Sequence, residues 1–310
     1  MIEKKVLWRE GTFLLIFIDV ILPVFFIFLS GYLLQKIFKL DLLPISTLAV
    51  YLLIPFLVFD TFYTTPMDLS FYYIVVTSVI IMAALIAAGL LLCRFFRYDK
   101  SERNAFLLST IFPNSGNYGV PIILFAFGKQ GVSYAMPLMI FHAILMGIVG
   151  IYIAANGKGS VKMALQTVLK QPMNYAIIPA LLLQFFHIEI PAHFLQSIEL
   201  VSDASIPVIM VILGMQLANV DVHKISWGRI SLATVVRLVL SPLIAFWVCV
   251  MFPIDPLLRN VIIVMAAMPS AANTTLYAIQ FNAKPQFVSS CTLITTVTSA
   301  VTLDILLSWF

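Results

Sequence analysis

PNSGNYGVP, residues 113–121, is the stretch that decides the fold of this 310-residue chain. It places two prolines, two glycines, two asparagines and a serine inside a run that is otherwise strongly apolar. Proline breaks a helix because it lacks an N–H donor and clashes with the preceding turn, whereas glycine lets the chain change direction at little steric cost. The stretch therefore predicts an interrupted helix, and the rest of the sequence indicates where that interruption lies.

The composition predicts that this helix lies in a membrane. Hydrophobic residues make up 62% of the chain and charged residues only 10%, whereas a soluble domain averages about a quarter charged residues. So few charges do not cover a water-facing surface, and we expect a polytopic membrane protein. The formal net charge of +4 does not indicate nucleic-acid binding, because the basic residues lie in short loops between apolar runs, where they set the orientation.

Ten stretches are apolar and long enough to cross the bilayer, which takes about 20 residues in a helix. They cover residues 13–36, 44–63, 71–93, 102–127, 133–155, 172–187, 194–218, 228–252, 258–281 and 286–309. The runs are continuously apolar, without the alternation of barrel strands, so they predict helices. We interpret the first as a transmembrane helix, because it is too long for a signal peptide and lacks a small-residue cleavage site.

Lysine and arginine counts predict the orientation of these spans. The loops after the odd-numbered spans carry twelve basic residues, and the opposite side carries five. By the positive-inside rule the first side is cytoplasmic, so both termini face outward from the cell (inner) membrane. The twelve are Lys36, Lys39, Arg94, Arg97, Lys100, Arg103, Lys158, Lys162, Lys170, Lys224, Arg229 and Lys284, and the five are Lys4, Lys5, Arg9, Lys129 and Arg259.

The two halves of the chain repeat at a fixed offset of 156 positions. Pro113 and Asn117 in the first half match Pro269 and Asn273 in the second, without a gap. The same offset pairs Arg103 with Arg259, Asn104 with Asn260, Gln130 with Gln286, Ser133 with Ser289 and Pro23 with Pro179. Each half holds five spans, and because five is odd the second half must be inverted. Inverted repeats with irregular helices at matching positions are typical of secondary transporters.

We therefore expect an all-α membrane protein with ten transmembrane helices in a 5+5 inverted repeat, in which the broken helices 4 and 9 cross. Residues 1–155 form the first repeat, residues 156–171 a cytoplasmic linker loop, and residues 172–310 the second repeat. The three cysteines are scattered, and His142 has no second ligand at i+3 or i+4. The sequence thus predicts neither a disulfide framework nor a metal site.

The broken helices predict a binding site for an anion. An unpaired backbone group in hydrocarbon costs several kcal/mol, so a break persists only when buried in protein or lining a watery cavity. Half-helix N-termini present free N–H groups and bind anions, and we expect Asn117, Asn273, Thr274 and Thr275 to cap them. The candidate substrate-binding residues are Pro113, Asn114, Ser115, Asn117, Pro121, Pro269, Asn273 and Thr274. The alternative is that the prolines only kink the helices and shape their packing. The matched breaks at Pro113 and Pro269 make this the weaker interpretation.

Ionisable residues within the predicted spans are functional candidates, because they are costly in a membrane. Arg237 and Asp203 lie near mid-depth of the eighth and seventh spans. Two interpretations stay open: the two residues pair as a structural bridge, or Arg237 attracts the anion while Asp203 relays protons. Asp60, at the end of the second span, is a second candidate for proton coupling.

Several stretches carry a resemblance to a known family. They are ILPVFFIFLSGYLLQK (residues 21–36), YLLIPFLVFDTF (51–62), PNSGNYGVPI (113–122), KQPMNYAIIPALLL (170–183), SIPVIMVILGMQL (205–217), VVRLVLSPLI (235–244) and MPSAANTTLYA (268–278). In these stretches, which follow in order over nearly the whole chain, the sequence resembles the auxin efflux carrier family, with its plant auxin carriers and bacterial malate- or malonate-type carriers. The NxGNxGxP pattern is the most specific part, and the lack of a long cytoplasmic loop is similar to the short bacterial members.

The resemblance implies a scaffold of helices 1, 2, 6 and 7, often a homodimer contact, and a mobile transport unit of helices 3–5 and 8–10. It also implies that the crossover residues line the substrate site, which here are Pro113, Asn114, Asn117, Pro121, Pro269 and Asn273. Substrate, coupling ion and transport direction vary within the family, so the resemblance fixes none of them.

The predicted function is efflux or exchange of a small organic anion, such as a carboxylate, by alternating access. A sodium-coupled symporter of the bile-acid type is the alternative, since unwound backbone carbonyls hold Na⁺ in such folds. A channel fits broken inverted helices less well. A receptor built on this scaffold also stays open. We predict no enzyme, because GxGD, HExxH and GxSxG signatures are absent from the sequence. We expect no catalytic residue, cofactor or nucleic-acid partner, and the partners are the anion, the lipid bilayer and a second copy of the chain, with H⁺ or Na⁺ coupling left open.

Overall fold

A computed structural model describes residues 13–66, 68–155, 161–220 and 227–310. Within these ranges the regular elements are helices joined by short loops, and the β-structure is limited to an isolated antiparallel bridge between Pro113 and Ser270. Seven of the described helices are long and apolar enough to cross a membrane. The protein is therefore a multi-pass helical membrane protein. Lys4, Lys5, Arg9, Lys158 and Lys224, which entered the orientation count, lie outside the described residues.

The first three spans are long helices, two of them containing a π-helical turn. The first consists of α1 (Phe13–Ile16), η1 (Phe17–Ile21) and α2 (Leu22–Phe38). The second consists of α3 (Leu42–Leu48), η2 (Ala49–Leu53) and α4 (Ile54–Thr64), and the third is α5 (Leu69–Phe95). Asp41 and Asp68 cap α3 and α5 by accepting backbone N–H hydrogen bonds, as short acidic side chains do at helix starts.

The helix predicted at 102–127 is interrupted, as expected. It begins as α6 (Lys100–Ile111) and resumes as η3 (Ser115–Gly119) and α7 (Val120–Leu145), followed by η4 (Met146–Gly150) and α8 (Ile151–Ala154). Gly128 within α7 has a φ of 66° and a ψ of −166°, a conformation that only glycine adopts readily. The chain turns there, between the predicted fourth and fifth spans. A short helix, α9 (Val161–Leu169), lies in the predicted linker.

The second half begins with α10 (Pro172–Phe185) and α11 (Ala192–Ala218). Next come α12 (Trp227–Val235), η5 (Val236–Leu240) and α13 (Ser241–Val250), which form one helix. The predicted ninth span is interrupted between α14 (Pro256–Ala266) and α15 (Asn273–Gln280), and α16 (Pro285–Leu307) ends the chain.

The ten predicted spans and the seven long helices differ for a physical reason. Residues 115–154 form one continuous stretch in which only Gly128 departs from helical geometry, so the predicted fourth and fifth spans meet in it. The helices over the predicted sixth and ninth spans, α10 and α14, are apolar but only 14 and 11 residues long. A helix needs about 20 residues to cross the bilayer core, so the criterion of length leaves these segments out.

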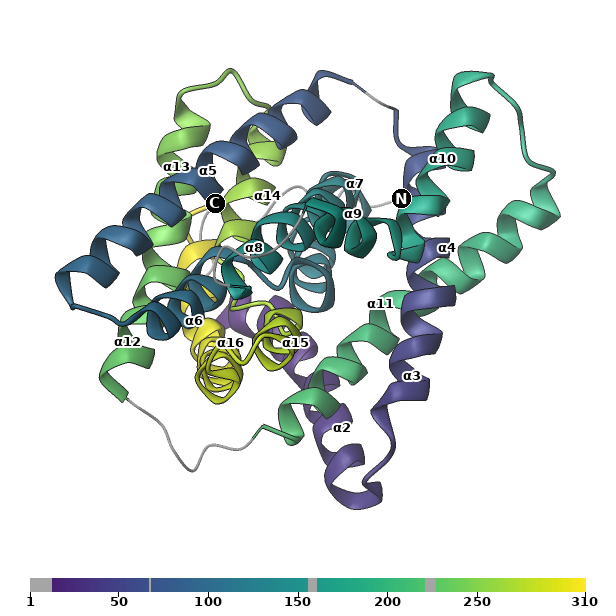
Figure 1. The fold of residues 1–310 in the computed structure, drawn as a ribbon. Coiled ribbons are helices and arrows are strands. Elements are labelled where there is room, and N and C mark those ends of the chain that lie inside the picture. Colours follow the sequence, from purple (N-terminus) through teal and green to yellow (C-terminus); the bar gives the residue numbers. More distant parts are fainter. Residues whose placement is uncertain (1–12, 67, 156–160, 221–226) are drawn as a thin grey trace.

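The helices form two groups (Figure 1). In one group α11 packs along α2 and α4, and α10 packs along α4. The contact between α2 and α11 is very close, because a Cβ at Gly31 would lie 2.1 Å from the Val211 carbonyl oxygen, and one at Gly214 would lie 2.0 Å from the Phe28 carbonyl oxygen. Small residues permit such approach between membrane helices. The second group contains α5, α6, α12, α13, α14 and α16.

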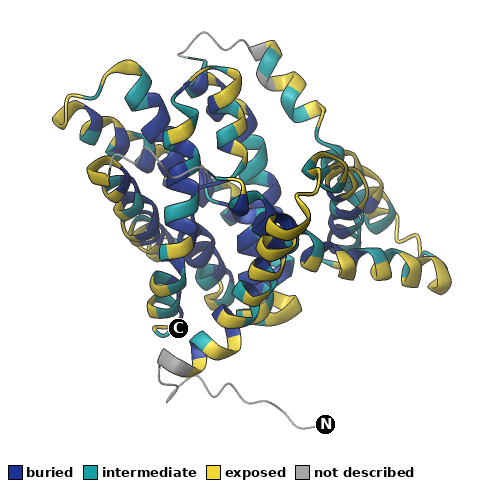
Figure 2. Ribbon diagram, turned by 90° about the horizontal axis from the view of Figure 1, so that it is seen from below, coloured by how far each residue is buried: buried dark blue, intermediate teal, exposed yellow. Residues whose placement is uncertain are grey.

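Buried residues gather in the interior of the bundle, and exposed residues lie on the outward faces (Figure 2). The outward faces carry large apolar side chains such as Phe26, Phe95 and Leu200, each at least 70% exposed. Hydrocarbon tails are a suitable environment for such a surface, and water is not. The interior in turn holds many serine and threonine hydroxyls, most of which donate to a carbonyl three or four residues earlier.

Candidate functional site

The two interruptions lie against each other. The Asn114 N–H donates to the Pro269 carbonyl at 2.8 Å, and the Ala271 N–H donates to the Phe112 carbonyl at 2.9 Å. The two backbone segments run antiparallel and are joined at the bridge between Pro113 and Ser270. Each break therefore satisfies part of the other's backbone, which the low polarity of a membrane interior demands.

Local sequence explains why the helices stop here. Phe112, which precedes Pro113, has an extended conformation with φ −95° and ψ 116°, as the residue before a proline prefers. A Cβ at Gly119 would lie 2.7 Å from the Met265 sulfur. Glycine at this position thus allows the restarted helix to pack directly against α14.

Arg237 holds the upstream ends of both broken helices. Its Nη1 donates to the Thr110 and Ile111 carbonyls at 2.8 and 2.9 Å, and its Nη2 donates to the Ala266 carbonyl. Ser241 accepts from Nη2 at 2.5 Å and donates to the same Ala266 carbonyl at 2.8 Å. The last carbonyls of a helix lack intrahelical partners and carry partial negative charge. A guanidinium that is 1% exposed is therefore compensated by the C-terminal ends of α6 and α14.

The downstream helices η3 and α15 begin at one cavity, which we call the front cavity. It has a volume of about 110 Å³ and is lined by both restarted helices together with α7 and the starts of α4 and α10. Its polar lining residues are Asn114, Ser115, Asn117, His142 and Asn273. The backbone hydrogen bonds found at the breaks do not use the amides of Gly116, Asn117, Ala272 or Asn273.

Hydrogen-bonding groups in the front cavity lack partners in the described part of the chain. The Asn114 Nδ2 is buried and has no hydrogen-bond partner there, although buried polar atoms are almost always paired. No side-chain cap is found at the start of η3 or of α15. The prediction that Asn117, Asn273, Thr274 and Thr275 cap these helices is therefore wrong. The residues at the N-cap positions are Asn114 and Ala272, and neither places a side-chain oxygen within hydrogen-bonding distance of the first amides.

The structure brings five of the eight predicted substrate-binding residues to the front cavity, namely Pro113, Asn114, Ser115, Asn117 and Asn273. The other three lie beside it. Pro121 is buried in the first turn of α7, and the Pro269 carbonyl accepts the Asn114 N–H. The buried Thr274 hydroxyl donates to the Ala271 carbonyl at 2.7 Å, so it stabilises the turn before α15.

The three charged candidates lie outside the front cavity. Asp203 is 67% exposed and pairs with Lys129 at 3.7 Å, and Asp60 accepts a hydrogen bond from Ser202 at 2.8 Å. Both aspartates line a separate cavity between α4, α7 and α11. The suggested bridge between Arg237 and Asp203 does not form, because the guanidinium is turned toward the broken helix ends, whereas Asp203 is turned outward. Arg237 likewise does not line the front cavity.

His142 belongs to the wall of the front cavity, and the sequence did not single it out for this role. The Ser115 hydroxyl lies 2.7 Å from its Nδ1. The signal in the sequence is a lone imidazole in the apolar run MIFHAILM, where it has no second metal ligand at i+3 or i+4. Among the described residues no group of three or more potential metal ligands is found.

The start of α6 is held by a different set of charges. Asp99 and Glu102 form a capping box, and Glu102 also accepts hydrogen bonds from Lys284 at 2.9 Å and from Arg229. The Glu102 N–H, which donates to the Asp99 carboxylate, and nearby Lys284 keep the pKa of Asp99 below its usual range. This cluster joins α6 to the starts of α12 and α16.

The chain is similar to known membrane proteins over nearly its full length. A family model described as membrane transport protein matches residues 16–307. A protein described as an uncharacterized transporter of Methanocaldococcus jannaschii is 26% identical over 294 residues, which cover 91% of this chain and 94% of that protein. A second uncharacterized transporter, of Methanothermobacter thermautotrophicus, is 24% identical over 295 residues, or 93% and 96% of the two chains. Neither description names a substrate.

Proposed function

Because this chain belongs to the auxin efflux carrier family of membrane transport proteins, we propose that it is a secondary active transporter of a small organic anion such as a carboxylate. One observation carries the substrate class: η3 and α15 both begin at the front cavity, with amides and the Asn114 Nδ2 that have no partner in the described chain. Such donors suit a carboxylate, because helix N-termini attract anions.

The proposed architecture is a ten-helix 5+5 inverted repeat with crossing fourth and ninth helices. Its support is that the two breaks occur at positions 156 residues apart and pair in antiparallel orientation. The helices α2, α4, α10 and α11 would form the scaffold, and the second helix group with α7 the transport unit. A homodimer through the scaffold remains part of this proposal.

The proposed orientation places both termini outside the cell (inner) membrane. In that orientation the front cavity would be nearer the cytoplasmic side, since its wall includes Met146, near the end of the fifth span, and Met173, at the start of α10. Both lie close in sequence to the linker at 156–171. Alternating access would then expose the same donors to the opposite side when the transport unit moves.

Coupling to sodium by a bile-acid type of mechanism is the alternative. Sodium-like hard cations favour oxygen ligands, with carboxylates prominent among them. The described residues that line the front cavity include no aspartate or glutamate. This lining favours an anion over a bare cation as the substrate, and a sodium ion would depend on the unwound backbone carbonyls at the breaks.

The test is transport in proteoliposomes. Labelled dicarboxylates and aromatic monocarboxylates are offered in counterflow, with and without Na⁺ and with and without a pH gradient. We expect counterflow of at least one carboxylate, and a loss of at least tenfold in Asn117→Ala and in Asn273→Ala, with normal folding. Asn260→Ala is the matched control, because Asn260 does not line the front cavity. Counterflow of none of the carboxylates would refute the substrate class, and dependence on Na⁺ alone would support the alternative.

A further inference from the structure

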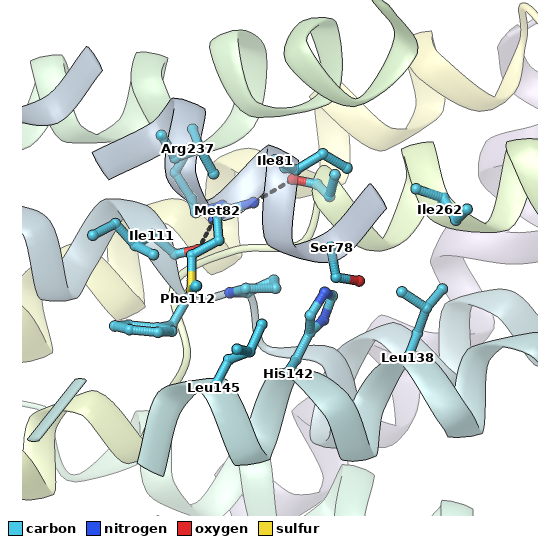
Figure 3. A pocket seen from close by; sticks show the side chains of 13 residues that line it. Ser78, Ile81, Met82, Ile111, Phe112, Leu138, His142, Leu145, Arg237 and Ile262 are labelled. Atoms are coloured by element: carbon cyan, nitrogen blue, oxygen red, sulfur yellow. Dashed lines mark hydrogen bonds between the residues drawn. The ribbon is translucent and has the colours of Figure 1, made fainter. Parts of the chain in front are cut away.

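A second, smaller cavity lies behind the first break, and we call it the rear cavity. It has a volume of about 30 Å³, and its polar lining residues are Ser78 of α5, His142 of α7 and Arg237 of η5. The other side chains that line it are apolar. Figure 3 shows the Ser78 hydroxyl beside the imidazole of His142, with Arg237 on the neighbouring helix. None of the predicted substrate-binding asparagines lines it.

Two residues that line the rear cavity each carry a polar atom without a partner in the described part of the chain. The Ser78 Oγ and the Arg237 Nε are buried without a hydrogen bond, and their residues are only 2% and 1% exposed. The neighbouring Thr77 shows what a hydroxyl in α5 ordinarily does, because it donates to the Tyr73 carbonyl at 2.6 Å. No such bond is found for Ser78, so its hydroxyl can bond to a water in the cavity that its residue lines.

Water is the ligand that fits these atoms. Buried polar atoms are nearly always hydrogen-bonded, and an unpaired one costs about 1–3 kcal/mol. To hold one water, a cavity needs roughly 10–15 Å³ of space for the centre of a water-sized sphere, and the water needs at least two polar partners. The rear cavity meets both requirements, with room for about two waters by that measure.

His142 forms part of the wall between the two cavities, because it lines both together with Phe112 and Pro113. Its Nδ1 is hydrogen-bonded to Ser115 of the front cavity, and no protein partner of its Nε2 is found among the described residues. The described residues that line either cavity carry only two titratable groups, His142 and Arg237. Arginine keeps its charge at all ordinary pH values, and histidine is the side chain whose ordinary titration lies nearest neutral pH, so His142 is the candidate in these walls for a change of charge on anion binding.

We propose that the rear cavity is an internal water site, in which water bridges Ser78 Oγ, Arg237 Nε and His142 Nε2, and that His142 takes up a proton when an anion enters the front cavity. The second half of this proposal rests on the proposed function. Neutral imidazole and one solvent proton give imidazolium, which offsets one negative charge of the anion. Imidazolium donates from both nitrogens, to Ser115 on one side and to the water on the other. The Ser115 O–H is thereby released to donate to the anion.

The sign of the coupling follows from linkage. Anion binding raises the affinity of His142 for a proton, so protonation must raise the affinity for the anion by the same factor. Anion binding is therefore tighter at lower pH. Among the described residues that line the two cavities, the only further charge near His142 is the Arg237 guanidinium. It donates to the carbonyls of α6 and α14, and the negative charge of the bound anion has to offset its remaining repulsion of an imidazolium.

Hydroxyl-radical labelling of the full protein in nanodiscs tests the water site without any substrate. Leu85 lines the rear cavity and is 2% exposed, whereas Leu108 is 0% exposed and lines neither cavity. Radicals formed from an internal water should label Leu85 several-fold more than Leu108. Ser78→Val and Ser78→Thr are a matched pair of nearly equal volume, and we expect the valine variant to lose this labelling and the threonine variant to keep it. Equal labelling of Leu85 and Leu108 in the unmodified protein would overturn the water site.

Calorimetry in two buffers of different ionisation enthalpy tests the proton. With malonate as the probe, we expect net proton uptake on binding near neutral pH, and uptake close to zero in His142→Gln, which retains an amide donor toward Ser115. Binding of malonate without proton uptake in the unmodified protein would overturn the role of His142. If neither malonate nor any other carboxylate of the transport screen binds, the proposed function and the proton step fall together, whereas the labelling result still decides the water site.

Discussion

The upstream ends of the two breaks, where α6 and α14 finish, differ from the downstream ends, where η3 and α15 begin. The upstream carbonyls of Thr110, Ile111 and Ala266 all accept hydrogen bonds from the Arg237 guanidinium. The downstream amides face the front cavity, with no side-chain cap on either helix. Each break thus has a closed side, where Arg237 occupies the helix-end carbonyls, and an open side, where the first amides of the next helix face the front cavity.

This difference separates stability from binding. Carbonyls at the end of a helix need donors, and a membrane interior supplies no water to provide them. Arg237 fills that need permanently, so the upstream carbonyls are not available to a substrate, and only the Arg237 Nε is left for the proposed internal water. The downstream amides are donors and need an acceptor instead, and an anion that enters and leaves is such an acceptor. The comparison predicts that substitutions on the two sides damage different properties.

The largest effect is expected on the closed side. Arg237→Met removes the donor to three buried carbonyls, and removing one partner of a buried charged contact costs about 3–5 kcal/mol. We expect the purified variant to unfold at a markedly lower temperature in detergent, or to fail to accumulate in the membrane. Arg237→Lys should be intermediate, because an ammonium lacks the planar fork that reaches two helix ends at once. An unfolding temperature of Arg237→Met equal to that of the unmodified protein would remove the distinction between the two sides.

A smaller effect, confined to binding, is expected on the open side. Asn114→Ala removes the buried Nδ2 that has no protein partner among the described residues. A lost hydrogen bond to a charged ligand costs about 1.5–3 kcal/mol, which corresponds to a dissociation constant larger by roughly 10- to 150-fold. The unfolding temperature without ligand should stay the same or rise, because the alanine leaves no unpaired amide. Both quantities are measured on one preparation, by thermal unfolding and by titration with the transported carboxylate.

The breaks themselves were predictable from the sequence, and their two sides were not. Proline and glycine act on their own backbone, so PNSGNYGVP located the interruption between Ile111 and Ser115. The repeat at an offset of 156 likewise located the second interruption. These inferences need only local geometry and a comparison of the two halves.

The role of Arg237 depends on information that side-chain patterns do not contain. Its partners are backbone carbonyls, and every residue has one, so no residue type marks them in the sequence. The sequence therefore suggests an acidic partner such as Asp203, which in the structure faces outward and pairs with Lys129. His142 was missed for a similar reason, since its neighbour Ser115 lies 27 positions away on another helix.

The smallest effect is expected at the opposite end of α6, where exposed charges replace the buried guanidinium. Glu102→Gln weakens the contacts with Lys284 and Arg229, whose side chains are 39% and 44% exposed, and exposed ion pairs are worth about 0–1 kcal/mol. We expect a fall of a few degrees at most in the unfolding temperature, and less in high salt, which screens such pairs. The contribution of Asp99 has a defined pH window, because a carboxyl whose pKa is lowered by folding stabilises the fold above the unfolded pKa of about 4 and loses that effect as the pH falls further. A loss in Glu102→Gln as large as that in Arg237→Met, and independent of salt, would show that the surface cluster and not the guanidinium holds α6 in place.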